Sequence, residues 1–131
     1  MNIAAILLSV CIAVSSMPTT KADLEEQGFV KLKTTAYCMG TTTASGTPVR
    51  PGVVATDKTH RGMMCEIYLV DEETGLLGEY LGLYSCEDAG GTDAIKEGRV
   101  IDVYRKTYQQ CKSYMKLTKG RCWVRYIEGE G

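Results

Sequence analysis

Residues 99–104, Arg-Val-Ile-Asp-Val-Tyr, place an aspartate, Asp102, within a run of β-branched and aromatic residues. Such a run predicts a strand whose flanks are covered by other parts of the chain. Residues 52–57, Gly-Val-Val-Ala-Thr-Asp, have the same character and end in a second aspartate, Asp57. A third, Asp88, stands in Cys-Glu-Asp-Ala-Gly-Gly at 86–91. A carboxylate among buried neighbours is costly unless donors satisfy it, so each acid is either a structural turn or loop residue or is kept for chemistry.

The chain has 131 residues, of which 44% are hydrophobic, and this size predicts a single domain. Residues 3–14 form an apolar run that is too short to span a bilayer and is followed by polar residues. We therefore assign residues 1–22 to a signal peptide or N-terminal anchor and residues 23–131 to the folded domain. This organisation predicts a secreted or cell-wall-associated protein, with contact to a membrane only through an uncleaved N-terminal segment.

The cysteines favour an exported protein, because five of them follow residue 22, a density typical of oxidising compartments. Because five is an odd number, the expected pattern is two disulfides and one free thiol. All five cysteines can also stay reduced in a cytosol. With one histidine, His60, and no CxxC pair, we expect neither a metal site nor a cofactor, and a Cys–His nucleophile has little support.

Charge is nearly balanced over the whole chain, but residues 99–125 contain eight basic residues and one acid, Asp102. This imbalance indicates either a basic face near a site or a solvated helix face. The sequence has no arginine-rich tract and no nucleic-acid-binding motif, so DNA and RNA are not expected as partners.

The pattern along the chain is mostly β. Residues 39–51 have loop composition, and residues 71–75 have the composition of a hairpin turn. A helix is predicted over 107–115, with Thr107 as its N-cap and Gln110 completing a capping box. The predicted strands span 29–37, 52–56, 63–70, 78–85, 99–104 and 122–127. Several short strands and one short helix predict a compact barrel.

These stretches also resemble a known family. The chain is similar to the three-aspartate domain, found in bacterial and phage cell-wall proteins and related to the catalytic domain of the membrane-bound lytic transglycosylase A group. The similarity covers about residues 33–127 and keeps the order of the family's motifs. Its motifs here are Thr35-Ala36-Tyr37-Cys38, residues 43–49 (Thr-Ala-Ser-Gly-Thr-Pro-Val), residues 52–57, Asp88-Ala89-Gly90-Gly91, Ala94-Ile95-Lys96 and Ile101-Asp102-Val103-Tyr104.

Two segments depart from the family pattern. Thr92-Asp93 is inserted before Ala94, which lengthens the segment between Asp88 and Asp102. A longer surface loop costs little, but it leaves open the register of one acid against the other. Residues 58–62, after Asp57, also lack the family's usual Ile-Pro-Leu-Gly.

The resemblance implies a mainly β fold, a six-stranded double-psi β-barrel with one short helix, and three acids beside one groove. It implies cleavage of peptidoglycan glycan strands between N-acetylmuramic acid and N-acetylglucosamine, with formation of 1,6-anhydro ends. A glycosidic bond that breaks through an oxocarbenium-like transition state needs a proton for the leaving oxygen, and a carboxyl with a raised pKa supplies it.

By motif position Asp102 matches the family's catalytic aspartate, acting first as general acid and then as general base. Asp88 would tune and position it, and Asp57 would hold substrate or the local network. Gly90 and Gly91 would allow the backbone to approach a sugar closely. Tyr37 and Thr43 are candidates for the groove wall, with core packing and loop ordering as their alternatives. Lys96 is a candidate for a substrate carboxylate, with plain solvation as its alternative, and Trp123 is expected in the core rather than against a sugar.

Two other classes remain open. A non-catalytic cell-wall carbohydrate-binding module of the expansin type would use the same barrel without turnover. A secreted structural or interaction protein would use the acids only to join loops. In every case we expect a monomer.

Overall fold

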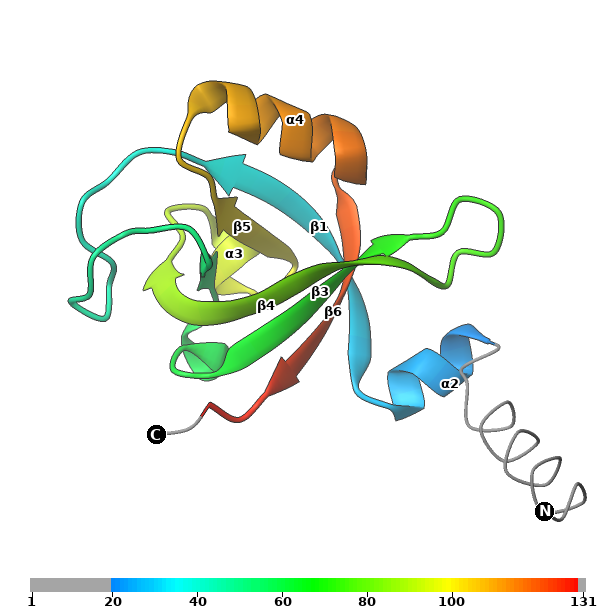
Figure 1. The fold of residues 1–131 in the computed structure, drawn as a ribbon. Coiled ribbons are helices and arrows are strands. Elements are labelled where there is room, and N and C mark those ends of the chain that lie inside the picture. Colours follow the sequence, from blue (N-terminus) through cyan, green and yellow to red (C-terminus); the bar gives the residue numbers. More distant parts are fainter. Residues whose placement is uncertain (1–19, 130–131) are drawn as a thin grey trace, which may run out of the picture.

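The computed structural model describes residues 20–129, and the apolar run at 3–14 lies outside them. Six strands form a closed barrel in the order β1-β5-β2-β4-β3-β6, which confirms the expected six-stranded barrel (Figure 1). The β1–β5 and β2–β4 pairs are parallel, and the other four pairs are antiparallel. Their bounds are β1 Phe29–Tyr37, β2 Val53–Thr56, β3 Met64–Val70, β4 Leu77–Ala89, β5 Val100–Tyr104 and β6 Arg121–Ile127.

The strand bounds agree with the prediction to within one residue except at the end of β4, which was expected at residue 85 and lies at Ala89. Asp88 therefore lies in a strand rather than in the following loop. The reason is that β4 pairs with β3 over its first part and with β2 over its last part, and the second pairing lies beyond the hairpin. Residues 71–75 join β3 to β4, as their composition predicted.

The helices are more numerous than the single one expected. The predicted helix is α4, Tyr108–Thr118, and the Thr107 hydroxyl caps it by accepting from Gln110 N. The Gln110 side chain accepts from Lys106 N rather than from the N-cap residue, so the expected capping box is modified. The additional helices are α2 Lys21–Glu26, α3 Asp93–Lys96 and the short 3₁₀ helix η1 Lys58–His60. No helix within residues 20–129 combines the length and the apolar character that a membrane span requires.

The barrel interior is the main core. Alternate residues of each strand enter it, among them Ile67, Ile101, Val103 and Val124, all fully buried. Tyr114 of α4 joins them, and its hydroxyl lies 2.7 Å from Thr34 Oγ1 of β1. This contact fixes α4 against β1, beside which the helix lies in Figure 1.

A second cluster of buried side chains lies outside the barrel. Leu24 of α2 packs there with Phe29, Val70 and Trp123. The Trp123 indole N–H donates to Gly75 O at 3.0 Å, so Trp123 is a core residue, as expected. The cluster joins α2 and the β3–β4 turn to the barrel, and α2 starts within the segment that we assigned to a signal peptide.

None of the five cysteines among the described residues forms a disulfide, so the expected pairing is not shown. Cys65 and Cys86 are adjacent in the barrel core. Cys38 and Cys111 are also adjacent, and burial raises the pKa of the Cys111 thiol, with its hydrogen bond to Cys38 adding to the effect.

Candidate functional site

Two of the three aspartates flank one residue of strand β2. In the barrel β2 lies between β5 and β4, and Ala55 of β2 pairs with Asp102 on one side and with Asp88 on the other. On the far side of β5, Thr35 of β1 pairs with Asp102. Neighbouring strands are about 4.8 Å apart, so the backbones at Asp88 and Asp102 are separated by roughly 10 Å. Asp88, Ala55 and Asp102 thus form one row across three neighbouring strands, and the insertion of Thr92-Asp93 between the two acids is compatible with this row.

A β-bulge sets which acid of β4 joins this row. The register passes from Val54 opposite Cys86 to Ala55 opposite Asp88, which leaves Glu87 without a partner on β2. Bulges of this kind redirect a side chain and are common beside functional sites. Without the bulge Glu87 would occupy the position opposite Ala55.

Asp102 is half-buried and faces away from the barrel interior, since Ile101 and Val103 on either side of it point into the core. Its Oδ1 accepts a hydrogen bond of 2.8 Å from the Thr35 hydroxyl. Burial raises the pKa of the Asp102 carboxyl, the Thr35 hydrogen bond opposes this rise, and the negative charge of Asp88 adds to it. The protonated form of Asp102 is therefore favoured more than that of an ordinary aspartate.

Asp88 is held by three donors. Its Oδ2 accepts from the Tyr37 hydroxyl at 2.9 Å, and its Oδ1 accepts from Ala44 N at 3.0 Å and Ala89 N at 2.9 Å. These three donors fix the orientation of the Asp88 carboxylate, whose negative charge contributes to the raised pKa of Asp102. Burial raises the pKa of the Tyr37 phenol, and its hydrogen bond to Asp88 raises it further, so Tyr37 remains a proton donor.

Tyr37 is thus neither a plain core residue nor a free groove residue. It is half-buried, and its ring meets the edge of Tyr104 with 5.5 Å between centroids. Because Tyr37 and Tyr104 pair across β1 and β5, two residues beyond Thr35 and Asp102, the aromatic pair borders the row of acids.

The loop at 39–51 closes over the end of β4. Thr43 is buried, and its hydroxyl lies 2.7 Å from Thr47 Oγ1, so it orders the loop. Arg50 donates to both carboxylate oxygens of Glu87, at 3.0 and 2.7 Å. This ion pair lowers the pKa of Glu87 to about 2. Glu87 therefore anchors the loop while Asp88 faces the site.

Asp57 does not share these contacts. It follows β2 and is buried, and its carboxylate lies 2.7 Å from His60 Nδ1. The His60 ring stacks on Tyr126 with 3.7 Å between centroids. Asp57 thus belongs to a local network with His60 on η1, and its assignment to the substrate site stays a prediction.

The remaining predicted residues lie beyond Asp88. Gly90 and Lys96 line a cavity of 330 Å³ together with Thr56, Ala89 and two further cations, Lys58 and Arg61. A Cβ atom on Gly90 would lie 2.4 Å from the Ile95 side chain, so the glycine is needed for packing against α3. A Cβ on Gly91 would meet nothing within 4 Å. Thr92 is the N-cap of α3, so the two residues that lengthen the segment between Asp88 and Asp102 form the start of this helix.

Sequence reasoning missed three residues near these acids: Thr35, Tyr104 and His60. Thr35 and Tyr104 stand within the motifs quoted above, but their roles depend on the parallel pairing of β1 with β5. His60 stands three residues after Asp57, a spacing that suits a pair on one helical turn, and this was the available signal.

No protein-family model matches the chain, and no curated protein sequence was found to match it. Among solved structures, a Streptomyces papain inhibitor is similar at 16% identity and a TM-score of 0.49, over 76% of this chain and 94% of the inhibitor. A variant of the E. coli lytic transglycosylase MltA is similar at 21% identity and a TM-score of 0.47, over 70% of this chain and 28% of that one. A second structure of MltA from E. coli gives 24% identity and a TM-score of 0.42, over 70% of this chain and 29% of MltA. This chain thus spans less than a third of the MltA chains, and similarity at this level carries no information on activity.

Proposed function

We propose that this protein cleaves the glycan strands of peptidoglycan as a lytic transglycosylase, with Asp102 as its single catalytic acid and base. One observation carries the proposal: a half-buried carboxyl with a raised pKa lies in one row with a second carboxylate, on the outward side of a barrel. Perturbed acids of this kind are typical of sites that donate a proton near neutral pH. The motif resemblance supplies the substrate class.

The reaction needs one group that first gives and then takes a proton. Protonated Asp102 would donate its proton to the glycosidic oxygen while the bond between that oxygen and the muramoyl anomeric carbon breaks. The Asp102 carboxylate would then remove the proton of the muramoyl C6 hydroxyl, whose oxygen forms a bond to the same anomeric carbon. The product is a 1,6-anhydro end, no water is consumed, and Asp102 returns to its protonated form.

Asp88 and Tyr37 would act through Asp102 or the substrate rather than by proton transfer. The Asp88 carboxylate, which three donors hold in place, favours the protonated form of Asp102 and would stabilise positive charge on the sugar ring in the transition state. Tyr37 fixes the orientation of Asp88 by its hydrogen bond. Both are positioning residues in this mechanism.

The cavity beside Gly90 is the proposed contact for charged substituents of the substrate. Lys58, Arg61 and Lys96 line it, and none of the three forms an ion pair among residues 20–129. The Arg61 Nε atom is buried and has no hydrogen-bond partner within the described part of the chain. Carboxylates of the lactyl group or the stem peptide would satisfy these donors. In this scheme Asp57 supports the neighbouring η1 segment through His60.

A second candidate is a cell-wall carbohydrate-binding module without turnover. It is favoured by the hydrogen bonding of Asp88, whose two oxygens are both occupied by donors that join β1, the 39–51 loop and β4. An acid bound in this way also serves a purely structural purpose. Under either candidate we propose that the protein acts outside the cytoplasm as a monomer.

The test is digestion of purified peptidoglycan with the protein, followed by mass spectrometry of the released muropeptides. Anhydro ends support the transglycosylase, and reducing ends of the same sugars indicate hydrolysis and contradict the proposed mechanism. Sedimentation of the protein with peptidoglycan, without released products, supports the binding module instead.

A further inference from the structure

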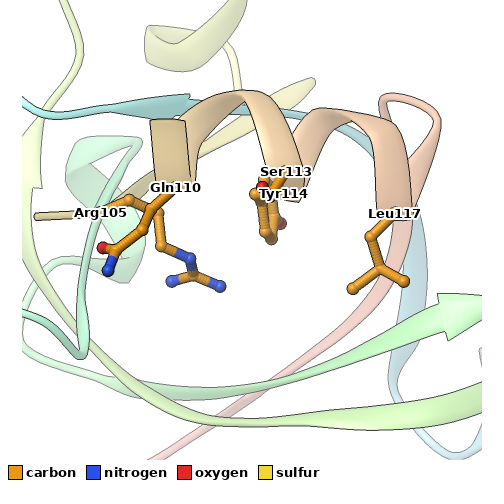
Figure 2. A pocket seen from close by; sticks show the side chains of 5 residues that line it. All are labelled: Arg105, Gln110, Ser113, Tyr114 and Leu117. Carbon is orange, nitrogen blue, oxygen red and sulfur yellow. The ribbon is translucent and has the colours of Figure 1, made fainter. Parts of the chain in front are cut away.

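A second cavity lies under α4, in contact with residues of the helix and with the residue that follows β5. It has a volume of 420 Å³ and is lined by Arg105, Gln110, Ser113, Tyr114 and Leu117. Figure 2 shows the Arg105 guanidinium, the Tyr114 ring and the Leu117 side chain below the helix, with the Gln110 amide beside Arg105. The volume is within the range of small-ligand sites.

Arg105 is a half-buried cation, and residues 20–129 provide no acidic partner for it. Its guanidinium donates to Tyr104 O and to the Tyr84 hydroxyl, both at 3.2 Å, and lies 4.7 Å from the centroid of the Tyr114 ring. No carboxylate of the described residues is within ion-pair distance of it. Since a guanidinium carries five N–H donors, several remain for a ligand in a fixed and planar arrangement.

The other lining groups add donors and an apolar surface. Gln110 uses its side-chain oxygen to accept from Lys106 N, so its amide N–H groups remain for the cavity. Ser113 contributes an exposed hydroxyl. Leu117 is 53% exposed and, with the Tyr114 ring, forms the apolar part of the lining. The cavity therefore offers hydrogen-bond donors at the end near Arg105 and an apolar surface at the end near Leu117.

The surface of α4 is positively charged, like Arg105 in the cavity. The α4 sequence, Tyr-Gln-Gln-Cys-Lys-Ser-Tyr-Met-Lys-Leu-Thr, contains no acid. Lys106, Lys112 and Lys116 are exposed and form no ion pair within residues 20–129. Unpaired cations around a cavity raise the local concentration of anionic ligands.

We propose that this cavity binds the C-terminal carboxylate of a peptide, with the side chain of the terminal residue on Leu117 and Tyr114. A carboxylate matches the planar fork of one guanidinium, whereas a multiply charged phosphate would call for more than the single cation in the lining. A C-terminal residue carries its side chain on the carbon next to the carboxylate, so one short ligand reaches both ends of the cavity. This proposal does not depend on the activity assigned to Asp102.

The test titrates the full chain with N-acetyl-leucine and follows backbone amide signals of α4 and of Arg105 by NMR. N-acetyl-leucinamide, which lacks the charge, and acetate, which lacks the apolar body, are the matched probes. We expect saturable shifts with N-acetyl-leucine and at least about tenfold weaker binding of the amide, the effect of losing a hydrogen bond to a charged group. Equal binding of N-acetyl-leucine and its amide, equal binding of acetate, or no saturable shift would each overturn the proposal.

Three variants locate the binding. Arg105→Gln removes the guanidinium, and Leu117→Glu puts a negative charge into the cavity at an exposed position where the fold tolerates it. Both are expected to weaken N-acetyl-leucine binding at least about tenfold. Lys31→Gln removes a charge from an exposed position of β1, outside the cavity lining, and should retain binding. If Arg105→Gln does not fold, Leu117→Glu decides the result, and wild-type affinity in a folded Leu117→Glu protein would contradict the assignment.

Discussion

Asp88 and Asp102 lie opposite the same residue, Ala55, on the two sides of strand β2. The bulge at Glu87 produces this arrangement on β4, and the ordinary alternation of β5 produces it on the other side. The two acids are 14 residues apart in the sequence, but in the barrel they are only two strand spacings apart. The electrostatic influence of Asp88 on the pKa of Asp102 follows from this relationship.

The hydrogen bond from the Thr35 hydroxyl lowers the pKa of Asp102, so removal of this hydroxyl should raise that pKa. Thr35→Val removes the hydrogen bond that stabilises the ionised Asp102 carboxylate, so the pKa of Asp102 is expected to rise further above its usual value. Carboxyl-carbon NMR titration measures it directly. Thr35→Ser keeps the hydroxyl and serves as the control. A pKa that falls or stays constant in Thr35→Val would show that this hydrogen bond does not govern Asp102.

The raised pKa of Asp102 also makes stability depend on pH. The folded state holds this proton more tightly than the unfolded chain, so stability present below the unfolded pKa is lost as pH rises through the folded pKa. Asp102→Asn cannot ionise and is expected to unfold at a higher temperature than wild type at pH 7. The difference should shrink as pH falls through the pKa of Asp102. Each 1 kcal/mol corresponds to roughly 4 °C in a domain of this size. Calorimetry of both proteins at several pH values measures this difference. An Asp102→Asn protein that is less stable than wild type at pH 7 would contradict the prediction.

Gly90 and Gly91 form a matched pair for testing packing near the site. Gly90→Ala places a methyl group 2.4 Å from Ile95, whereas a methyl on Gly91 meets nothing within 4 Å. We expect Gly90→Ala to lower the free energy of unfolding by about 1–3 kcal/mol, as overpacking does, and Gly91→Ala to be nearly neutral. Chemical denaturation of both variants measures the difference. Equal stabilities would show that α3 moves freely to admit the methyl group.

Leu24 anchors the short helix α2 to the second core cluster. It is fully buried against Phe29, Val70 and Trp123. Leu24→Ala is expected to cost about 2–5 kcal/mol of unfolding free energy, the usual range for a buried leucine. Glu26→Ala on the exposed side of the same helix should change stability by less than about 0.5 kcal/mol. If both substitutions prove equally mild in urea unfolding, the burial of Leu24 contributes little.

The sequence predicted the six strands because each combines β-branched residues with turn signals at its ends, and α4 because Thr107 marks its start. It missed α2 and α3, which are too short for a helical period to be visible over four to six residues. The bulge at Glu87 leaves no sign in composition, so the end of β4 was placed four residues too early. The contact of Thr35 with Asp102 joins residues 67 apart, and only the pairing of β1 with β5 determines it.

The proposed role of Asp102 as the acid of a glycan-cleaving site is tested most directly by the yield of anhydro-muropeptides from peptidoglycan. This yield is compared between wild type and two carboxyl-to-amide variants. Asp102→Asn removes the proposed acid, and Glu79→Gln makes the same chemical change at an exposed residue of β4. We predict anhydro ends from wild type and Glu79→Gln, and a loss of at least about a hundredfold with a folded Asp102→Asn protein. Wild-type yield from Asp102→Asn would contradict the mechanism.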